Sequence, residues 1–267
     1  MALSQGELYT IITNKNAKGK KGALVAIIAG TKADEVIEHI CKIDCQRRLS
    51  VKEITLDMAN SMKMIARKCF PKAIQVTDRF HVQKLALEAL QEIRIKHRWE
   101  AMDMENQAII KAKLENKTHI LTLLSNGDSL KQLLARSRYL LYKSREKWTM
   151  KQHERAEILF DLYPDIKIAY NLSQQLRSIY NMNNDKNVAM LKLAHWYRKV
   201  EESGFKNFNI VLNTITVNYQ SILNYFENRS TNAAAESFNA KIKAFRSQFR
   251  GVRKIDFFLF RLSNLFA

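Results

Sequence analysis

The sequence predicts an α/β protein in which a mixed sheet with helices on its faces carries a large all-helical insertion. Two observations support this fold class. Residues 1–80 contain β-branched apolar runs that alternate with segments of helical periodicity. The stretch that follows is almost free of glycine and proline, and its apolar residues recur at spacings of three and four.

Four strands and two helices are expected in the N-terminal part, in the order strand, strand, helix, strand, helix, strand. The expected strands are residues 7–14, 22–30, 51–57 and 73–78, and the expected helices are residues 33–43 and 61–70. A turn rich in glycine, lysine and asparagine joins the first two strands, and Pro71 ends the second helix.

Residues 82–222 are expected to be helical, because they contain only Gly127, Gly204 and Pro164 as helix-breaking residues. No sequence period repeats, which argues against a solenoid. A further helix is expected in residues 228–254. The predicted domains are therefore a first part of the core at 1–84, a helical insertion at 85–228, and a C-terminal core helix within 229–267.

The composition is strongly basic, with 44 Lys and Arg against 26 Asp and Glu and a formal net charge of +18. Such an excess favours a polyanionic partner, most commonly nucleic acid, although a basic protein without a specific partner is the alternative. The sequence shows no signal peptide and no apolar run near the roughly 20 residues of a membrane span.

Three cysteines, an odd number, suit a reducing cytoplasm. Cys41 and Cys45 could reach one metal ion from a helix. No second Cys/His pair is nearby, so burial as small side chains is the preferred interpretation.

Three acids and one histidine are candidates for chemistry. Asp57 and Asp78 end two expected strands, where carboxylates can meet at the edge of a sheet, although aspartate is also common where strands end. His81 is three residues from Asp78, and a hydrogen bond between them could simply orient the ring. Glu236 lies in an alanine-rich first helical turn that would favour an acid on electrostatic grounds alone. Asn239 and Lys243 are expected on the same helix face.

A dense cationic run follows Glu236. Its members are Lys241, Lys243, Arg246, Arg250, Arg253 and Lys254. Phe238, Phe245 and Phe249 interleave with them, which predicts an aromatic face toward a core and a cationic face toward solvent. A solvated face is the simple interpretation, but like charges at this density repel one another unless a polyanion such as DNA is bound.

These motifs resemble those of a known family. Residues 51–94, VKEITLDMANSMKMIARKCFPKAIQVTDRFHVQKLALEALQEIR, are similar to the core of DDE transposases of the bacterial insertion-sequence family called ISL-three. Residues 231–261, TNAAAESFNAKIKAFRSQFRGVRKIDFFLFR, resemble the closing motif of that family, and the segment RYLLYKSREKWTMKQ is similar to its middle part.

The resemblance implies a ribonuclease H-like fold with a helical insertion before the last catalytic helix. It further implies three carboxylates that hold two divalent ions, Mg²⁺ or Mn²⁺, for attack on phosphodiesters. Asp57 and Glu236 match the second and third of these acids and are the expected catalytic metal ligands. Asp78 and His81 are expected to support the site or contact DNA. The implied partners are transposon ends and target DNA, with a homo-oligomer as a further expectation, in the bacterial cytoplasm at the nucleoid.

The sequence departs from the family pattern at its start. In the family, the first catalytic Asp lies in an Asp-Glu pair just before a segment similar to ALSQGELYTIIT, whereas no Asp precedes Asp34 here. The first strand and one ligand are therefore expected to be missing, and the polypeptide alone is expected not to cleave DNA. An upstream-encoded N-terminal segment could supply them. The alternative is a non-catalytic, DNA-binding transposase remnant.

Overall fold

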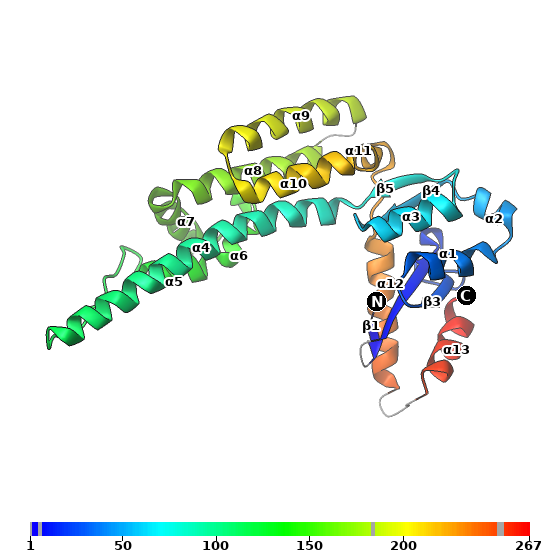
Figure 1. The fold of residues 1–267 in the computed structure, drawn as a ribbon, viewed down its shortest axis with the longest axis horizontal. Coiled ribbons are helices and arrows are strands. Elements are labelled where there is room, and N and C mark those ends of the chain that lie inside the picture. The colour runs from blue at the N-terminus through cyan, green and yellow to red at the C-terminus, as the bar shows by residue number, and fades with distance from the viewer. Residues whose placement is uncertain (1, 5–6, 183–184, 250–253) are drawn as a thin grey trace. The chain divides into compact units, whose positions relative to one another are not determined.

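The computed structural model describes residues 2–4, 7–182, 185–249 and 254–267, which form a mainly helical α/β protein (Figure 1). The chain divides into two compact units. Residues 1–79 and 218–267 form the first unit, and residues 80–217 form the second. The predicted combination of strands with a large helical part is confirmed.

The strands of the first unit lie in two small sheets. β1 (Ala2–Ser4), β2 (Glu7–Thr13) and β3 (Leu24–Ala29) form an antiparallel sheet in that order. β4 (Glu53–Leu56) and β5 (Ile74–Thr77) pair in parallel. The four expected strands are confirmed, and β1 precedes them where no strand was expected. The single mixed sheet is not observed, because no described strand bridges β1–β3 to β4–β5.

Both faces of the β2–β3 pair are covered by helices. One face, which includes Ile12 and Ile28, packs against α1 (Ala33–Cys41) and α3 (Asn60–Cys69). Tyr9 and Ile11 face the other way, toward α12 (Ala233–Gln248) and α13 (Ile255–Phe266). Burial on both faces explains why these strands read as continuous apolar runs rather than alternating ones. The short α2 (Cys45–Leu49) and the helix α11 (Tyr219–Asn228) complete the unit.

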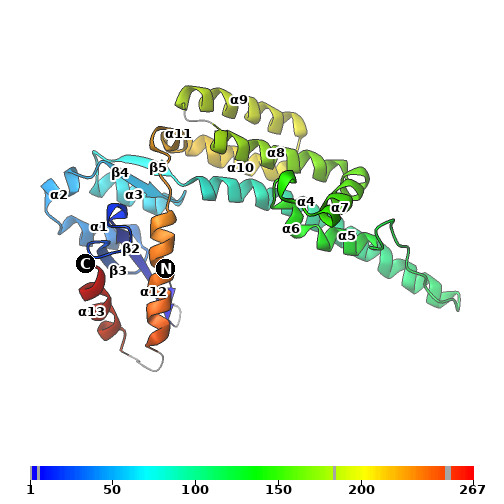
Figure 2. The ribbon, with the colours of Figure 1, turned by 180° about the vertical axis from the view of Figure 1, so that it is seen from behind.

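The second unit is all-helical in its described part, as the sequence predicts. It comprises α4 (Arg79–Leu114), α5 (Leu130–Arg136), α6 (Arg138–Leu141), α7 (Met150–Leu162), α8 (Pro164–Met182), α9 (Lys186–Ser203) and α10 (Lys206–Val217). Figures 1 and 2 show α8, α9 and α10 side by side, with the far end of α4 extending past them. None of the described helices has the length and apolar character needed to cross a membrane.

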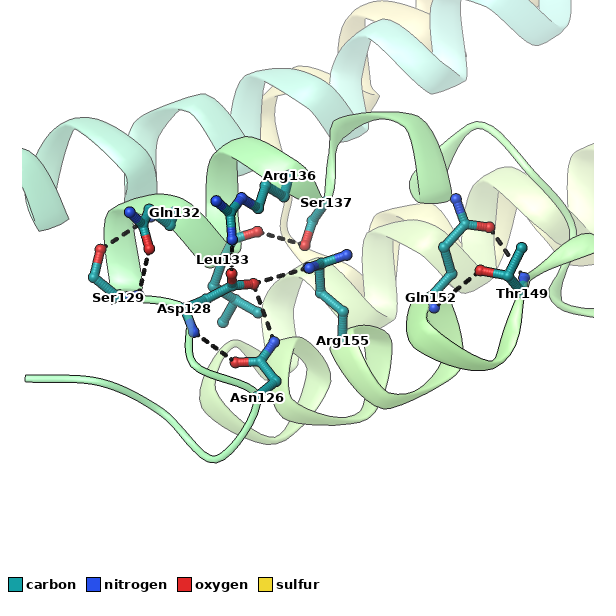
Figure 3. A network of polar contacts seen from close by, with 10 residues as sticks. All are labelled: Asn126, Asp128, Ser129, Gln132, Leu133, Arg136, Ser137, Thr149, Gln152 and Arg155. Atoms are coloured by element: carbon teal, nitrogen blue, oxygen red, sulfur yellow. Dashed lines mark hydrogen bonds and ion pairs between the residues drawn. The ribbon is translucent and has the colours of Figure 1, made fainter.

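A buried carboxylate joins the helices of the second unit (Figure 3). The side chain of Asp128 is 1% exposed and forms ion pairs with Arg136 and with Arg155, the latter at 2.9 Å. The Asn126 side chain donates a further hydrogen bond of 3.0 Å to the same carboxylate. Burial raises the pKa of Asp128, but the hydrogen bonds from Arg155 and Arg136 outweigh it and hold the pKa below its ordinary value. Asp128 therefore stays charged and links α5 to α7.

A second polar network lies in the first unit and centres on Glu53 of β4. Its carboxylate accepts hydrogen bonds from Lys15 Nζ at 2.8 Å and from Asn228 Nδ2 at 3.0 Å. Lys15 also contacts Ser230 Oγ at 2.7 Å, so the network ties β4 to the segment that leads into α12. Partial burial raises the pKa of Glu53, but the hydrogen bonds from Lys15, Ser230 and Asn228 outweigh this effect and hold the pKa below its ordinary value of 4.5.

The Glu53→Gln variant is expected to lower the stability of the first unit by about 1 kcal/mol at neutral pH, the typical net value of a hydrogen bond. Because the folded pKa is lowered, the Glu53 contribution is fully present above the unfolded value of 4.5 and is lost as pH falls through the folded pKa. The difference between variant and wild type should therefore shrink below pH 4.5. Calorimetric unfolding at a series of pH values measures this difference, and a difference that stays constant into acid would contradict the assignment.

The cysteines differ from their expected burial. Cys41 and Cys45 are exposed, and only Cys69 is buried, in the core between α1 and α3. Burial, together with the neighbouring Cys41, raises the pKa of Cys69 to about 11, so this thiol stays protonated. The expectation fails for Cys41 and Cys45 because they lie at the end of α1 and the start of α2, where the chain turns through solvent.

Candidate metal and DNA site

The parallel pairing of β4 and β5 brings two aspartates to one edge of their sheet. Leu56 pairs with Thr77 in the register, so Asp57 and Asp78 leave neighbouring strands at the same level. The backbone N–H of Asp78 donates to the carbonyl of Leu56 at 3.1 Å, which extends the ladder to this point. The sequence-based expectation that carboxylates follow adjacent strand ends thus agrees with the structure.

α11 lies against β5 and leads the chain to α12. Asn224 Nδ2 donates to the carbonyl of Gln75 at 3.0 Å, and the hydroxyl groups of Thr77 and Ser221 are 2.7 Å apart. Beyond α11, the backbone N–H of Asn232 donates to Asp78 Oδ2 at 3.3 Å. These contacts hold the start of α12 beside the end of β5.

Glu236 lies in the first turn of α12 and is thereby placed near Asp78. One carboxylate oxygen of each lies within 4.8 Å of the other. His81, three residues after Asp78 in the first turn of α4, is the third member of this group of potential metal ligands. Asp78 is buried and Glu236 is exposed. The group is thus open to a ligand from the Glu236 side.

Asp57 is not part of that group. Its side chain is half-buried, and its Oδ1 accepts a hydrogen bond of 2.9 Å from the backbone N–H of Ala59, just before α3. This bond fixes the turn that follows β4.

Asn239, one turn after Glu236, adds an unusual feature. Its side-chain oxygen is buried and has no hydrogen-bond partner among the described residues. A buried acceptor without a donor is costly.

The comparison with protein-family models gives a near-complete match. The model of the ISL-three DDE family, described as transposase, matches residues 1–262. The chain belongs to this transposase family. Searches of curated proteins and of solved structures found no match. Membership implies DNA as a partner and a divalent metal ion as a cofactor of the transposase.

The cations of α12 in the transposase point in different directions. The buried residues Phe238 and Ile242 define its core face, with Phe245 and Phe249 packed alongside, so the predicted aromatic face is confirmed. Lys241 donates to the carbonyl of Gly19, whereas the guanidinium of Arg246 lies over the ring of Phe258 at 5.1 Å.

The other predicted DNA contacts have separate positions. Lys243 is exposed, about 20° from Glu236 around the helix axis. Lys254 is also exposed, just before α13. Arg250 and Arg253 lie outside the described residues. The six cations were expected on one outward face, but the three described cations of α12 are distributed around the helix.

Two features of the site were not found from the sequence. Asn232 and Asp78 are 154 residues apart, so their contact depends entirely on how α11 packs beside β5. The supporting residues Ser221 and Asn224 belong to α11, which the sequence analysis placed in the insertion. Their polar side chains between the buried apolar residues of this helix were the available signal.

Proposed function

We propose that this chain forms the metal-dependent catalytic region of a DNA transposase that cuts and joins strands at the ends of an insertion sequence. The observation that supports this most directly is the approach of the Asp78 and Glu236 carboxylates at the carboxyl edge of β4 and β5. Family membership and the charge of +18 favour DNA as the substrate. The antiparallel β1–β3 sheet, the helix α1 and the parallel β4–β5 pair are in the order expected of a ribonuclease H-like core.

The residues at this edge fit a divalent cation. Mg²⁺ prefers oxygen ligands and usually binds one or two carboxylates while it keeps several waters, and Mn²⁺ tolerates similar donors. Asp78 and Glu236, with Asp57 at the same edge, supply such carboxylates. A bound ion would polarise a phosphodiester and activate its attacking hydroxyl group.

The protein's own residues would position the DNA. Lys243 lies on the same side of α12 as Glu236, where its ammonium group can bind a phosphate beside the carboxylates. The amino end of α12 adds the partial positive charge of a helix N-terminus on the same side. Lys254 extends the positive charge beyond α12. The cytoplasm, at the nucleoid, is the compartment in which such a protein meets its DNA.

The family pattern and the interatomic distances assign different roles to the three acids. The family pattern assigns metal binding to Asp57 and Glu236, with Asp78 and His81 in support. The interatomic distances instead favour Asp78 as the partner of Glu236. We propose that all three acids contribute, and the variants described in the Discussion rank them.

The test of this function is Mn²⁺-dependent nicking of a plasmid that carries the DNA flanking the gene for this chain. The assay is run with the chain alone and with an N-terminal Asp-Glu segment supplied. The comparison of the two samples tests the prediction that the chain alone is inactive. Nicking is expected in the sample with the supplied segment, together with its loss in Asp57→Asn and Glu236→Gln. Salt-sensitive DNA binding without nicking in both samples would favour the non-catalytic alternative.

A further inference from the structure

The connection between β2 and β3 is a well-defined loop. Asn14 caps the short 3-10 helix Lys15–Ala17 through a hydrogen bond from Asn16 N to its Oδ1 at 3.1 Å. Backbone hydrogen bonds then link Lys18 to Lys15, Lys20 to Ala17 and Ala23 to Lys20. The side chain of Ala17 packs on the core beside the buried Ala23. The loop therefore presents its side chains from a fixed backbone.

Its tip is held against α12. Lys241 Nζ donates to the carbonyl of Gly19 at 3.3 Å across 222 residues of sequence. Gly19 has a φ of +71°, and a Cβ at this position would lie 3.0 Å from Lys241 Nζ. The positive φ therefore favours glycine, whereas a larger residue would only require the end of the Lys241 side chain to shift by a few tenths of an ångström.

The loop and its contact on α12 concentrate positive charge. Residues 14–22 contain four lysines and no acid, and Lys15 alone among the four has an ion pair in the described structure, with Glu53. We refer to Lys18, Lys20 and Lys21, which are exposed and lack an ion pair there, as the hairpin lysines. Lys241 adds a fourth ammonium group at the same place. Four cations held together without a counter-charge raise the local potential and attract an anion.

This cluster lies on a different flank of α12 from the candidate metal site. Residues five apart on a helix are separated by about 140° around its axis, so Lys241 points well away from the direction of Glu236. Lys243, in contrast, shares the direction of Glu236. The anion attracted by the hairpin lysines is thus not the phosphate that meets the carboxylates.

We propose that the hairpin lysines, together with Lys241, bind the phosphate backbone of duplex DNA on the flank of α12 away from Glu236. The proposal rests on the proposed function, in that it takes DNA as the partner. Ammonium groups that extend from an ordered loop suit a polyanion, because their flexible side chains can reach successive phosphates from one fixed base. The contact is independent of base sequence and positions the duplex while the carboxylate edge acts elsewhere along the DNA.

The test uses a triple variant, Lys18→Gln, Lys20→Gln and Lys21→Gln, and measures binding to a labelled duplex by fluorescence anisotropy over a series of KCl concentrations in EDTA. Each phosphate contact contributes about 0.9 to the slope of log affinity against log salt. The triple variant is therefore expected to reduce the slope by about 2 to 3.

A matched control replaces Lys111, Lys151 and Lys206, three exposed lysines of the helical unit, with glutamine. It removes the same net charge and is expected to change the slope by less than about 1. An unchanged slope in the hairpin variant, or an equal change in the control, would overturn the proposal while leaving the proposed function intact. Wild-type protein with no salt-dependent DNA binding would instead remove the proposed function as well.

Discussion

The Glu236→Gln variant is expected to bind Mn²⁺ about 10- to 100-fold more weakly than the wild type, or more weakly still. Loss of a residue that only orients a metal ligand already costs about 10- to 100-fold in affinity, and Glu236 is proposed to be a ligand itself. Glutamine keeps the size of the side chain but removes the charge that a divalent cation requires. Glu236 is exposed, so the substitution should leave the fold intact. Titration of Mn²⁺ followed by electron paramagnetic resonance measures the affinity without depending on DNA cleavage.

The control for this experiment is Glu38→Gln, which removes the same charge from an exposed pair with Lys42 on α1. It is expected to bind Mn²⁺ like the wild type. Equal loss in the control would mean that only the net charge matters, and wild-type affinity in Glu236→Gln would place the ion elsewhere.

The same titration ranks the two aspartates. A larger loss in Asp57→Asn than in Asp78→Asn would support the family-based assignment, in which Asp78 is a supporting residue. The reverse order would identify Asp78 as the ligand that shares the ion with Glu236, as their separation of less than 4.8 Å favours.

The Asp128→Ala variant is expected to lower the free energy of unfolding of the helical unit by about 3 to 5 kcal/mol. Removing this 1%-exposed carboxylate leaves Arg155 partly buried without its counter-charge and deprives Asn126 of an acceptor. The three tryptophans, Trp99, Trp148 and Trp196, all lie within residues 80–217, so denaturation followed by tryptophan fluorescence reports on this unit.

An exposed ion pair of the same unit provides the control. Glu202 pairs with Arg198 at 2.8 Å on α9, and both side chains are more than half exposed. Glu202→Ala should cost no more than about 0.5 kcal/mol, as is usual for exposed pairs on a helix. If Asp128→Ala cost as little as this control, the buried network would not be what holds α5 to α7.

Much of the secondary structure could be predicted because local patterns dictate it. The β-branched runs around Ile11, Ile27 and Val76 form strands. The segment that ends just before Pro71 forms the expected helix, α3 (Asn60–Cys69). α2 and α13 were not predicted individually. α2 has only five residues, and α13 lies beyond the last segment for which a helix was expected.

The candidate site was predicted less completely. Asp57, Asp78, His81 and Glu236 were all identified as candidates from strand ends, helix starts and family motifs. The sequence could not show which of them meet, because the answer depends on the register of β4 against β5 and on the packing of α11. Nor could it show that Lys241 contacts the β2–β3 loop, since helical periodicity gives a direction but no partner.

The sequence by itself determined the helical and extended segments, the basic character and the transposase family, because each depends on local residue patterns or on motifs that are contiguous in the chain. The tertiary structure decided that Asp78 lies beside Glu236 and that the cations of α12 point to different sides. The physical reason is that the Asp78–Glu236 approach and the Lys241–Gly19 contact join residues more than 150 positions apart. Such proximity arises from strand register and helix packing, which leave no local trace in the sequence.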